Sequence, residues 1–445
     1  MLRRFNATGL WVAAALAAGP ALADDAPSTW AALWADRLSV HFQSTVATQW
    51  HPDFASPYAG ANSMQSYAEQ QTAFISSLYT DLRVGPETDV VFDPELSGGK
   101  GLSKSLGVAA FPSGVVYRVG NPAPTFYLAR LFLRHVFDLG GGHEDVKEGP
   151  NQVRATRGRD RLTVMVGRFA VTDLFDRNAF SSDPFTQFFD WALFASGAWD
   201  YPADTRGYTW GAMADLTLGP WSFRAGMALE PQYANLETLE WDITKARGLM
   251  AEGERRYEWR GYPGTVRVLA FVNQARMGSY RAVLVDPSAF NNNVAATRAD
   301  GRTKYGGAIS IDQRFDKSWG AFVRASFNDG ANESWAFTEV DRCLALGVVH
   351  DGSAWKRPGD EVGGAVVVSG LSGLHRQYLA GGGYGFIIGD GQLNYGFETE
   401  GDFYYRAQVS EWLQVSAIYQ PVINPAYNQD RGPIHIFTVR VHAAF

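Results

Sequence analysis

The last segment of the chain, IHIFTVRVHAAF (residues 434–445), alternates in polarity along its whole length. The apolar face of this segment comprises Phe437, Val439, Val441, Ala443 and Phe445. The opposite face carries Thr438, Arg440 and His442. Strict alternation predicts a β-strand with one apolar and one polar face. A final strand of this kind is typical of a membrane-spanning barrel, in which the apolar face contacts lipid and the polar face lines a lumen.

The start of the chain has the features of an export signal. Arg3 and Arg4 precede a short apolar run from Leu10 to Ala18, and Ala21-Leu22-Ala23 supplies small residues for cleavage. The apolar run is too short for a membrane anchor. We therefore predict a signal peptide over residues 1–23, followed by a single exported domain over residues 24–445.

Composition favours a barrel over a helical membrane protein. After the signal, no stretch approaches the ~18 apolar residues that a spanning helix needs, whereas a closed barrel needs no such run. Aromatic residues make up 14% of the chain and charged residues only 19%, which suits aromatic girdles around a wet interior. The net charge of −7 argues against nucleic acid as a partner. The single cysteine, Cys343, excludes an intramolecular disulfide and a cysteine-based zinc site.

Three further segments, residues 37–50, 127–139 and 393–406, alternate in the same way. The outward face expected for the second of these segments comprises Ala129, Leu131, Leu133 and Phe137. Each segment has at least the ~9–11 residues that a tilted spanning strand requires. We expect an all-β fold, a transmembrane antiparallel β-barrel of about 16 strands, with 18 strands as the alternative.

Clusters of Gly, Pro and Asp mark the expected hairpin turns. The turns are expected at Gly219-Pro220, Asp316–Ser318 and Asp390-Gly391. Longer connections can fold inward and constrict a pore. These connections comprise residues 51–70, 94–124, 174–206, 233–258, 286–302 and 330–361. Two stretches, residues 63–75 and 237–256, have the composition of short helices.

A soluble β-sandwich or jelly roll would also alternate. The expected inner faces, however, carry rows of Arg, Glu and Asp. A soluble core does not tolerate such charges without partners. The pattern therefore favours the membrane barrel.

One charged row, Glu398, Glu400 and Asp402, shares a strand face and is followed by Arg406. Neighbours in such a row lie ~7 Å apart, and paired carboxylates at that separation suit glycoside hydrolysis. In a barrel the same row would line the lumen or form a ladder of salt bridges, and we favour these interpretations. No nucleophile, zinc or phosphate motif accompanies the row. We therefore expect no enzyme activity, no catalytic residues, no metal site and no cofactor.

Arginines recur on the expected inner faces, among them Arg83, Arg130 and Arg134. A guanidinium can bind sugar hydroxyls or carboxylates, and it can also repel cations in a pore. Pairing with an inward carboxylate is an equally good interpretation for any one of them.

The connection at residues 174–206 combines aromatic, acidic and basic residues, including Trp191, Trp199 and Arg206. Aromatic faces can stack on the apolar faces of sugar rings, while polar groups bind the hydroxyls. The same aromatic residues could instead anchor the loop inside the barrel.

Several motifs resemble those of the carbohydrate-selective porins of the OprB type from Gram-negative bacteria. One is Val166-Gly167-Arg168-Phe169, and the more specific ones are the runs at 199–207 and 420–425. The resemblance implies a sixteen-stranded barrel with inward-folded loops in the cell outer membrane, present as a monomer or a homotrimer. It implies passive diffusion of mono- and small oligosaccharides without a cofactor. It also implies a constriction lined by charged and aromatic residues.

The sequence thus predicts a carbohydrate-selective porin whose partners are a carbohydrate substrate and outer-membrane lipid. A channel for acidic sugars or organic anions is the alternative, and a barrel-embedded hydrolase is a weaker one. The expected constriction residues are Arg83, Arg130, Arg134, Glu398, Glu400, Asp402, Arg406, Trp191, Trp199 and Arg206.

Overall fold

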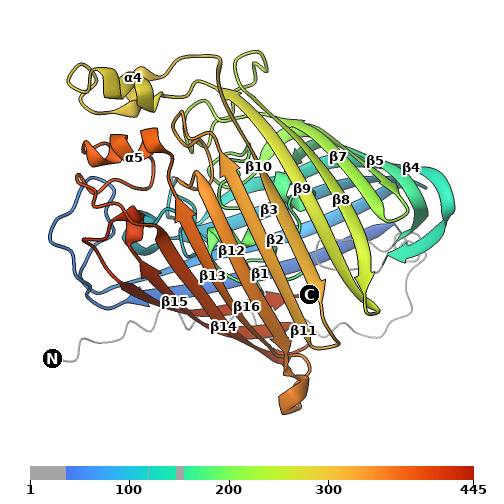
Figure 1. Ribbon diagram of the computed structural model, residues 1–445. Coiled ribbons are helices and arrows are strands. Elements are labelled where there is room, and N and C mark those ends of the chain that lie inside the picture. Colours follow the sequence, from blue (N-terminus) through green and yellow to red (C-terminus); the bar gives the residue numbers. More distant parts are fainter. Residues whose placement is uncertain (1–36, 119, 147–154) are drawn as a thin grey trace.

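A computed structural model describes residues 37–118, 120–146 and 155–445, and within them sixteen strands form a closed barrel (Figure 1). Each strand pairs with its neighbours in the sequence, and β1 closes the barrel by pairing antiparallel with β16. The predicted fold class and strand number are therefore confirmed. The predicted signal peptide, residues 1–23, lies outside the described residues.

The strands follow the chain in order around the barrel. They are β1 (Leu38–His51), β2 (Glu69–Gly85), β3 (Thr88–Gly99), β4 (Thr125–Val146), β5 (Ala155–Phe169), β6 (Thr209–Leu218), β7 (Trp221–Ala228), β8 (Arg247–Trp259), β9 (Tyr262–Ala275), β10 (Arg302–Arg314), β11 (Trp319–Asn328), β12 (Arg342–Asp351), β13 (Glu361–Gly370), β14 (Glu398–Ser410), β15 (Leu413–Ile423) and β16 (Ile434–Ala444). The helices are short and lie in the connections. They are α3 (Trp191–Phe194), α4 (Tyr280–Val285) and α5 (Gly373–Ala380), with the 3-10 turns η2 (Leu102–Lys104), η3 (Val171–Asp173), η4 (Val294–Thr297), η5 (Gly352–Trp355) and η6 (Pro425–Tyr427).

The closing strand has the two faces that its sequence predicts. Val439 and Phe445 point outward and are 55% and 52% exposed. Arg440 and His442 point inward and are buried. Thr45 of β1 lies opposite His442, and its hydroxyl is 2.8 Å from the His442 ring nitrogen Nδ1. The barrel is thus closed by a seam that is apolar outside and hydrogen-bonded inside.

The predicted outward position of Ala129 is wrong, because a β-bulge in β4 turns this residue inward. The pairing of β3 with β4 shifts between Asp93 and Pro94, which lie opposite Arg130 and Leu128. Ala129 is the extra residue, and its side chain is fully buried. Because a bulge inserts one unpaired residue, it reverses the alternation on its far side.

The turn predictions are confirmed at two of the three sites. Gly219-Pro220 joins β6 to β7, and residues 316–318 lie between β10 and β11. The expected hairpin at Asp390-Gly391 is wrong. These two residues belong to a long connection between β13 and β14 that also contains α5.

The two helices expected from composition are wrong as well, because the second half of each stretch is a strand and the first half is irregular. β2 begins at Glu69, within residues 63–75, and most of β8 lies within residues 237–256. β8 pairs with β7 and β9 along its length. Its Glu, Arg, Leu and Met residues favour a helix in isolation, but pairing with neighbouring strands overrides that preference.

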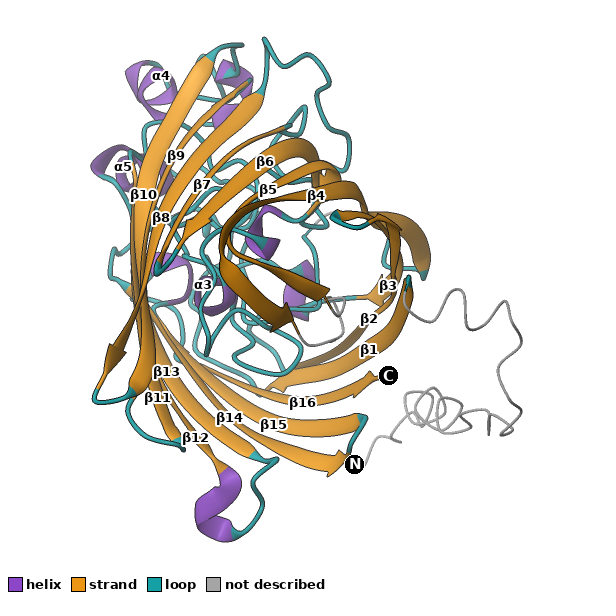
Figure 2. Ribbon diagram, turned by 90° about the vertical axis from the view of Figure 1, so that its right-hand side faces the viewer, coloured by secondary structure: helices purple, strands orange, loops and turns teal. Residues whose placement is uncertain are grey.

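The two ends of the barrel differ. Connections at one end, here the turn end, are mostly short, whereas long connections carrying α4 and α5 gather at the other, the loop end (Figure 1). Among the described residues, no helix has the length and apolar character required to cross a membrane. Several connections fold into the barrel interior (Figure 2).

Candidate functional site

The connection between β5 and β6, residues 170–208 and here called the inward loop, folds into the barrel and carries α3 (Figure 2). A cavity of about 660 Å³ remains between this loop and the inner faces of β16 and β1–β4. Its lining includes Trp412 in the turn between β14 and β15, and Asn235 in the long connection between β7 and β8. The cavity therefore extends between the turn end and the loop end of the barrel.

Two carboxylates of the predicted acidic row hold connections in place. Glu398 Oε1 accepts a hydrogen bond from the backbone N–H of Ala109 at 3.0 Å. Asp402 Oδ2 accepts hydrogen bonds from the backbone N–H groups of Phe189 at 2.7 Å and Asp190 at 3.0 Å. These carboxylates satisfy buried backbone donors that have no strand partner.

Glu400 lies between these two carboxylates and is 2% exposed. Its side chain contacts the carboxyl of Asp190, the residue that caps α3 by accepting a hydrogen bond from Ala192 N–H at 2.7 Å. Burial raises the pKa of Asp190 to about 8, and the charge of Asp402 acts in the same direction. Two buried carboxyl groups in contact do not both stay ionised, so at least one of Asp190 and Glu400 carries a proton.

Arginines from three strands hold the inward loop from other sides. Arg440 donates from Nη1 to two loop carbonyls, at 2.7 and 2.8 Å. Arg406 donates to the carbonyl of Thr186 at 3.2 Å. Arg324 forms a buried ion pair with Asp176 at 2.5 Å. The loop is thus fixed by charged side chains along much of its length.

These contacts correct the expectation that Glu398, Glu400, Asp402 and Arg406 line the lumen. The three acids are at most 2% exposed, and none of the four residues borders the cavity. Alternation gave the inward direction of their side chains. It did not reveal that a connection distant in sequence covers them.

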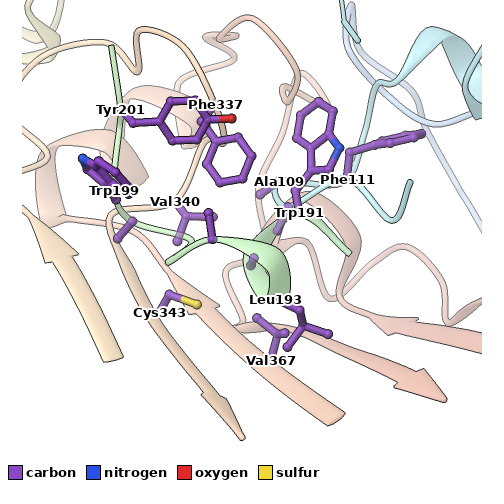
Figure 3. Packing of buried hydrophobic residues seen from close by; sticks show 14 of the residues in the cluster. Ala109, Phe111, Trp191, Leu193, Trp199, Tyr201, Phe337, Val340, Cys343 and Val367 are labelled. Atoms are coloured by element: carbon purple, nitrogen blue, oxygen red, sulfur yellow. The ribbon is translucent and has the colours of Figure 1, made fainter. Parts of the chain in front are cut away.

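The two tryptophans of the inward loop have different environments (Figure 3). Trp191 borders the cavity, donates from Nε1 to the carbonyl of Ser113 at 2.7 Å, and stacks on Phe337 with 5.8 Å between ring centroids. Trp199 is fully buried and packs edge-on against Phe175. Trp191 is 6% exposed, so only a small part of its ring can contact a solute in the cavity, whereas Trp199 is fully buried and no solute in the cavity can stack on it.

Arg130 borders the cavity, and two carboxylates hold its guanidinium in a fixed position. Its Nε and Nη2 atoms each donate to Asp173 at 2.8 Å, and Nη1 donates to Asp93 at 2.7 Å. The guanidinium carbon also lies 5.3 Å from the ring centroid of Tyr208. Because two carboxylates flank one guanidinium, the position of each charge is defined and the cluster carries no excess of positive charge.

Arg206 lies between two aromatic rings that border the cavity. Its guanidinium carbon is 4.4 Å from the ring centroid of Tyr117 and 4.3 Å from that of Tyr127. Nη1 donates to Ser97 Oγ at 2.9 Å, and Nη2 donates to Glu237 at 3.2 Å. The arrangement presents planar apolar and polar surfaces side by side.

Arg83 and Arg134 point inward but do not border the cavity. Arg134 pairs with Asp81 at 3.0 Å and with Asp89 at 2.8 Å, and Arg83 lies 3.5 Å from Asp89. The ten expected constriction residues are therefore not one cluster. Three of them, Arg130, Trp191 and Arg206, border the cavity.

Comparison with known proteins identifies the family to which this chain belongs. A family model described as carbohydrate-selective porin, OprB family, matches residues 62–445. This chain belongs to that family. Among solved structures, it is similar to the high-pH structure of Pseudomonas putida OprB, with a TM-score of 0.72 and 16% identity over 94% of this chain and 96% of that one. The low-pH structure of Pseudomonas putida OprB follows with a TM-score of 0.50 and 13% identity over 93% and 94%. None of the curated proteins compared matches the chain.

Membership of the OprB family, together with the barrel fold, places this porin in the outer membrane of Gram-negative bacteria. Family and fold indicate a channel rather than an enzyme. In bacterial outer-membrane barrels, short turns face the periplasm and longer loops face the outside. The cavity of this porin therefore lies along the direction of transport.

Three residues that border the cavity of this porin are not among the ten constriction residues predicted from the sequence. Glu95 borders the cavity and accepts a hydrogen bond from the Tyr208 hydroxyl at 2.8 Å. Tyr117 and Arg177 border it from the connections before β4 and after β5. The inward face of β3 could have revealed Glu95, because alternation places it beside Asp93. The paths of the two connections have no comparable signal.

Proposed function

We propose that this porin mediates passive diffusion of neutral mono- and small oligosaccharides across the outer membrane. The observation that carries the proposal is the cavity, which extends between the two ends of the barrel and whose wall includes paired charges and aromatic side chains. Membership of a carbohydrate-selective family supports the substrate class.

The chemistry of the wall suits sugars. Tyr117 and the small exposed part of Trp191 offer aromatic surface to the apolar sides of sugar rings. Arg130 and Asp173 offer donors and acceptors to hydroxyl groups. Their mutual pairing limits how tightly either can bind a solute, and conduction requires binding weak enough for release.

Swelling of liposomes that contain the purified porin tests the proposal. We expect rapid swelling in glucose, slower swelling in sucrose, and none in sized polymers that exceed the cavity. Equal rates for all small neutral solutes of one size, sugar or not, would contradict carbohydrate selectivity. Absence of swelling in every solute would contradict diffusion through the barrel.

Passage of acidic sugars or organic anions is a second candidate, favoured by Arg177. This residue borders the cavity and is exposed, and none of the described residues forms an ion pair with it. An exposed guanidinium attracts carboxylates. The reversal potential in a salt gradient separates the candidates, since strong cation preference would exclude the anion channel.

A further inference from the structure

An apolar hollow of about 560 Å³ lies on the outside of the barrel, in the wall formed by β9–β13. Strand register places its outward residues in two rows. The row nearer the loop end contains Gly307, Phe327, Arg342 and Gly370. The next row contains Val268, Ile309, Ala325, Leu344 and Val368.

Small residues create the hollow. Gly307, Ala325 and Gly370 leave space beside two large exposed rings, Phe327 and Phe397, which are 54% and 58% exposed. Because this surface contacts lipid, the depression is shaped to receive hydrocarbon rather than water.

Arg342 stands at the rim of the hollow. It is the first residue of β12, it is exposed, and it borders the hollow among apolar neighbours. Over the described part of the chain, no side chain forms an ion pair or hydrogen bond with its guanidinium. A charge on the lipid-facing surface near a strand end lies at the level of the headgroups, where an anionic group can reach it.

A second arginine lies above the same rim. Arg376 of α5 is exposed, and its guanidinium carbon is 4.6 Å from the ring centroid of Tyr395. The Tyr395 hydroxyl accepts a hydrogen bond at 3.2 Å from the backbone N–H of Leu371, which follows Gly370. Arg376 likewise has no ion pair within residues 37–118, 120–146 and 155–445. Two cations therefore stand beside one apolar depression.

We propose that this hollow binds a phosphorylated glycolipid of the outer leaflet, of the lipid A type. An acyl chain lies in the hollow, and a phosphate accepts hydrogen bonds from Arg342. The planar guanidinium fits two phosphate oxygens at once. The loop end of the barrel faces outward, so the lipid comes from the outer leaflet, where lipid A is the phosphate-bearing species. This site is separate from the transport cavity.

Native mass spectrometry of the full, delipidated porin in detergent tests the site. The probes are diphosphoryl lipid A, its dephosphorylated form and phosphatidylglycerol. We expect diphosphoryl lipid A to bind with the highest affinity. Loss of a charge-assisted hydrogen bond in Arg342→Gln should lower that affinity roughly tenfold or more. Ala325→Phe, which fills the hollow and keeps Arg342, should also lower it.

Arg255→Gln is the matched control, because Arg255 is exposed on β8 near the turn end, with its guanidinium carbon 4.6 Å from the ring centroid of Trp221. It should bind lipid A like the wild type, and all variants should keep the wild-type swelling rate and the spectrum of a folded barrel. Equal binding of phosphatidylglycerol, an unchanged affinity in Arg342→Gln, or an equal loss in Arg255→Gln would overturn the proposal. A lipid-free dimer that Ala325→Phe dissociates would overturn it in favour of a second copy as the occupant.

Discussion

Ala109 and Glu398 are 289 positions apart in the chain, yet the backbone N–H of Ala109 donates to Glu398 Oε1 at 3.0 Å. This contact ties the connection between β3 and β4 to the inner face of β14. Asp402, two positions further along the same face, holds the inward loop at Phe189. The open cavity lies on the other side of the inward loop, so its width depends on carboxylates that do not border it.

Removing the Glu398 carboxylate should therefore widen the channel. In Glu398→Ala, the backbone donors of Ala109 and Ala426 lose their acceptor, and each buried donor left without a partner costs about 1–3 kcal/mol. We expect a lower melting temperature and a higher single-channel conductance in planar bilayers. Glu258→Ala, an exposed site beside the turn after β8, is the control. Wild-type conductance and stability in Glu398→Ala would refute the anchoring role.

Substitution of the two tryptophans of the inward loop, Trp191 and Trp199, should affect sugar block differently. Trp191→Leu removes the part of an aromatic ring that borders the cavity and should weaken sugar block of the ion current by up to about fivefold, the effect of an aromatic contact of ~1 kcal/mol. Trp199→Leu should leave the block unchanged in the folded fraction. Because Trp191 is 6% exposed and Trp199 is fully buried, truncation of either side chain should reduce stability by up to about 3–5 kcal/mol, and the sugar block distinguishes the two variants. The reverse pattern would show that Trp199, rather than Trp191, contacts the solute.

Replacing Arg130 should alter both stability and ion selectivity. Arg130→Gln leaves Asp93 and Asp173 without their shared cation, and removal of one partner from a buried pair costs about 3–5 kcal/mol. The cavity wall also gains net negative charge, so the reversal potential in a KCl gradient should shift toward potassium. Arg83→Gln, away from the cavity, should shift it less. An unchanged reversal potential in Arg130→Gln would show that permeating ions do not sense this cluster.

The turn between β12 and β13 should respond to acid. Asp360 has a pKa lowered to about 2, because it accepts hydrogen bonds from Arg357 and the Tyr405 hydroxyl. A carboxyl whose pKa falls on folding stabilises the fold above its ordinary pKa near 4, and this contribution is lost as the pH falls toward 2. Carbon NMR titration of the Asp360 carboxyl, assigned by its absence in Asp360→Asn, should show a midpoint near 2. A midpoint near 4 would mean that these hydrogen bonds do not form in solution.

The sequence predicts the barrel wall better than its contents, for a physical reason. Alternation with period two acts within one strand, so residues 434–445 predict their own inner and outer faces. The β4 bulge depends on pairing with Pro94 of another strand, and the β8 strand depends on neighbours that override helix preference. Both features required knowledge of contacts that a single segment does not contain.

The same limit applies to the site. The inward direction of Arg130 and Glu398 follows from alternation. Only the fold shows that Arg130 borders open space while Ala109 and the inward loop cover the acidic row. The sign of a side chain's charge does not distinguish a residue that borders the cavity from one that anchors a loop.

The most direct test of the central claim is a glucose titration of the ion current through single channels of the purified porin. Weak sugar binding in the cavity predicts a reversible, saturable fall in conductance, and Trp191→Leu should shift its half-saturation to higher glucose. A decrease that only follows the viscosity of the solution, without saturation and identical in the variant, would contradict the account.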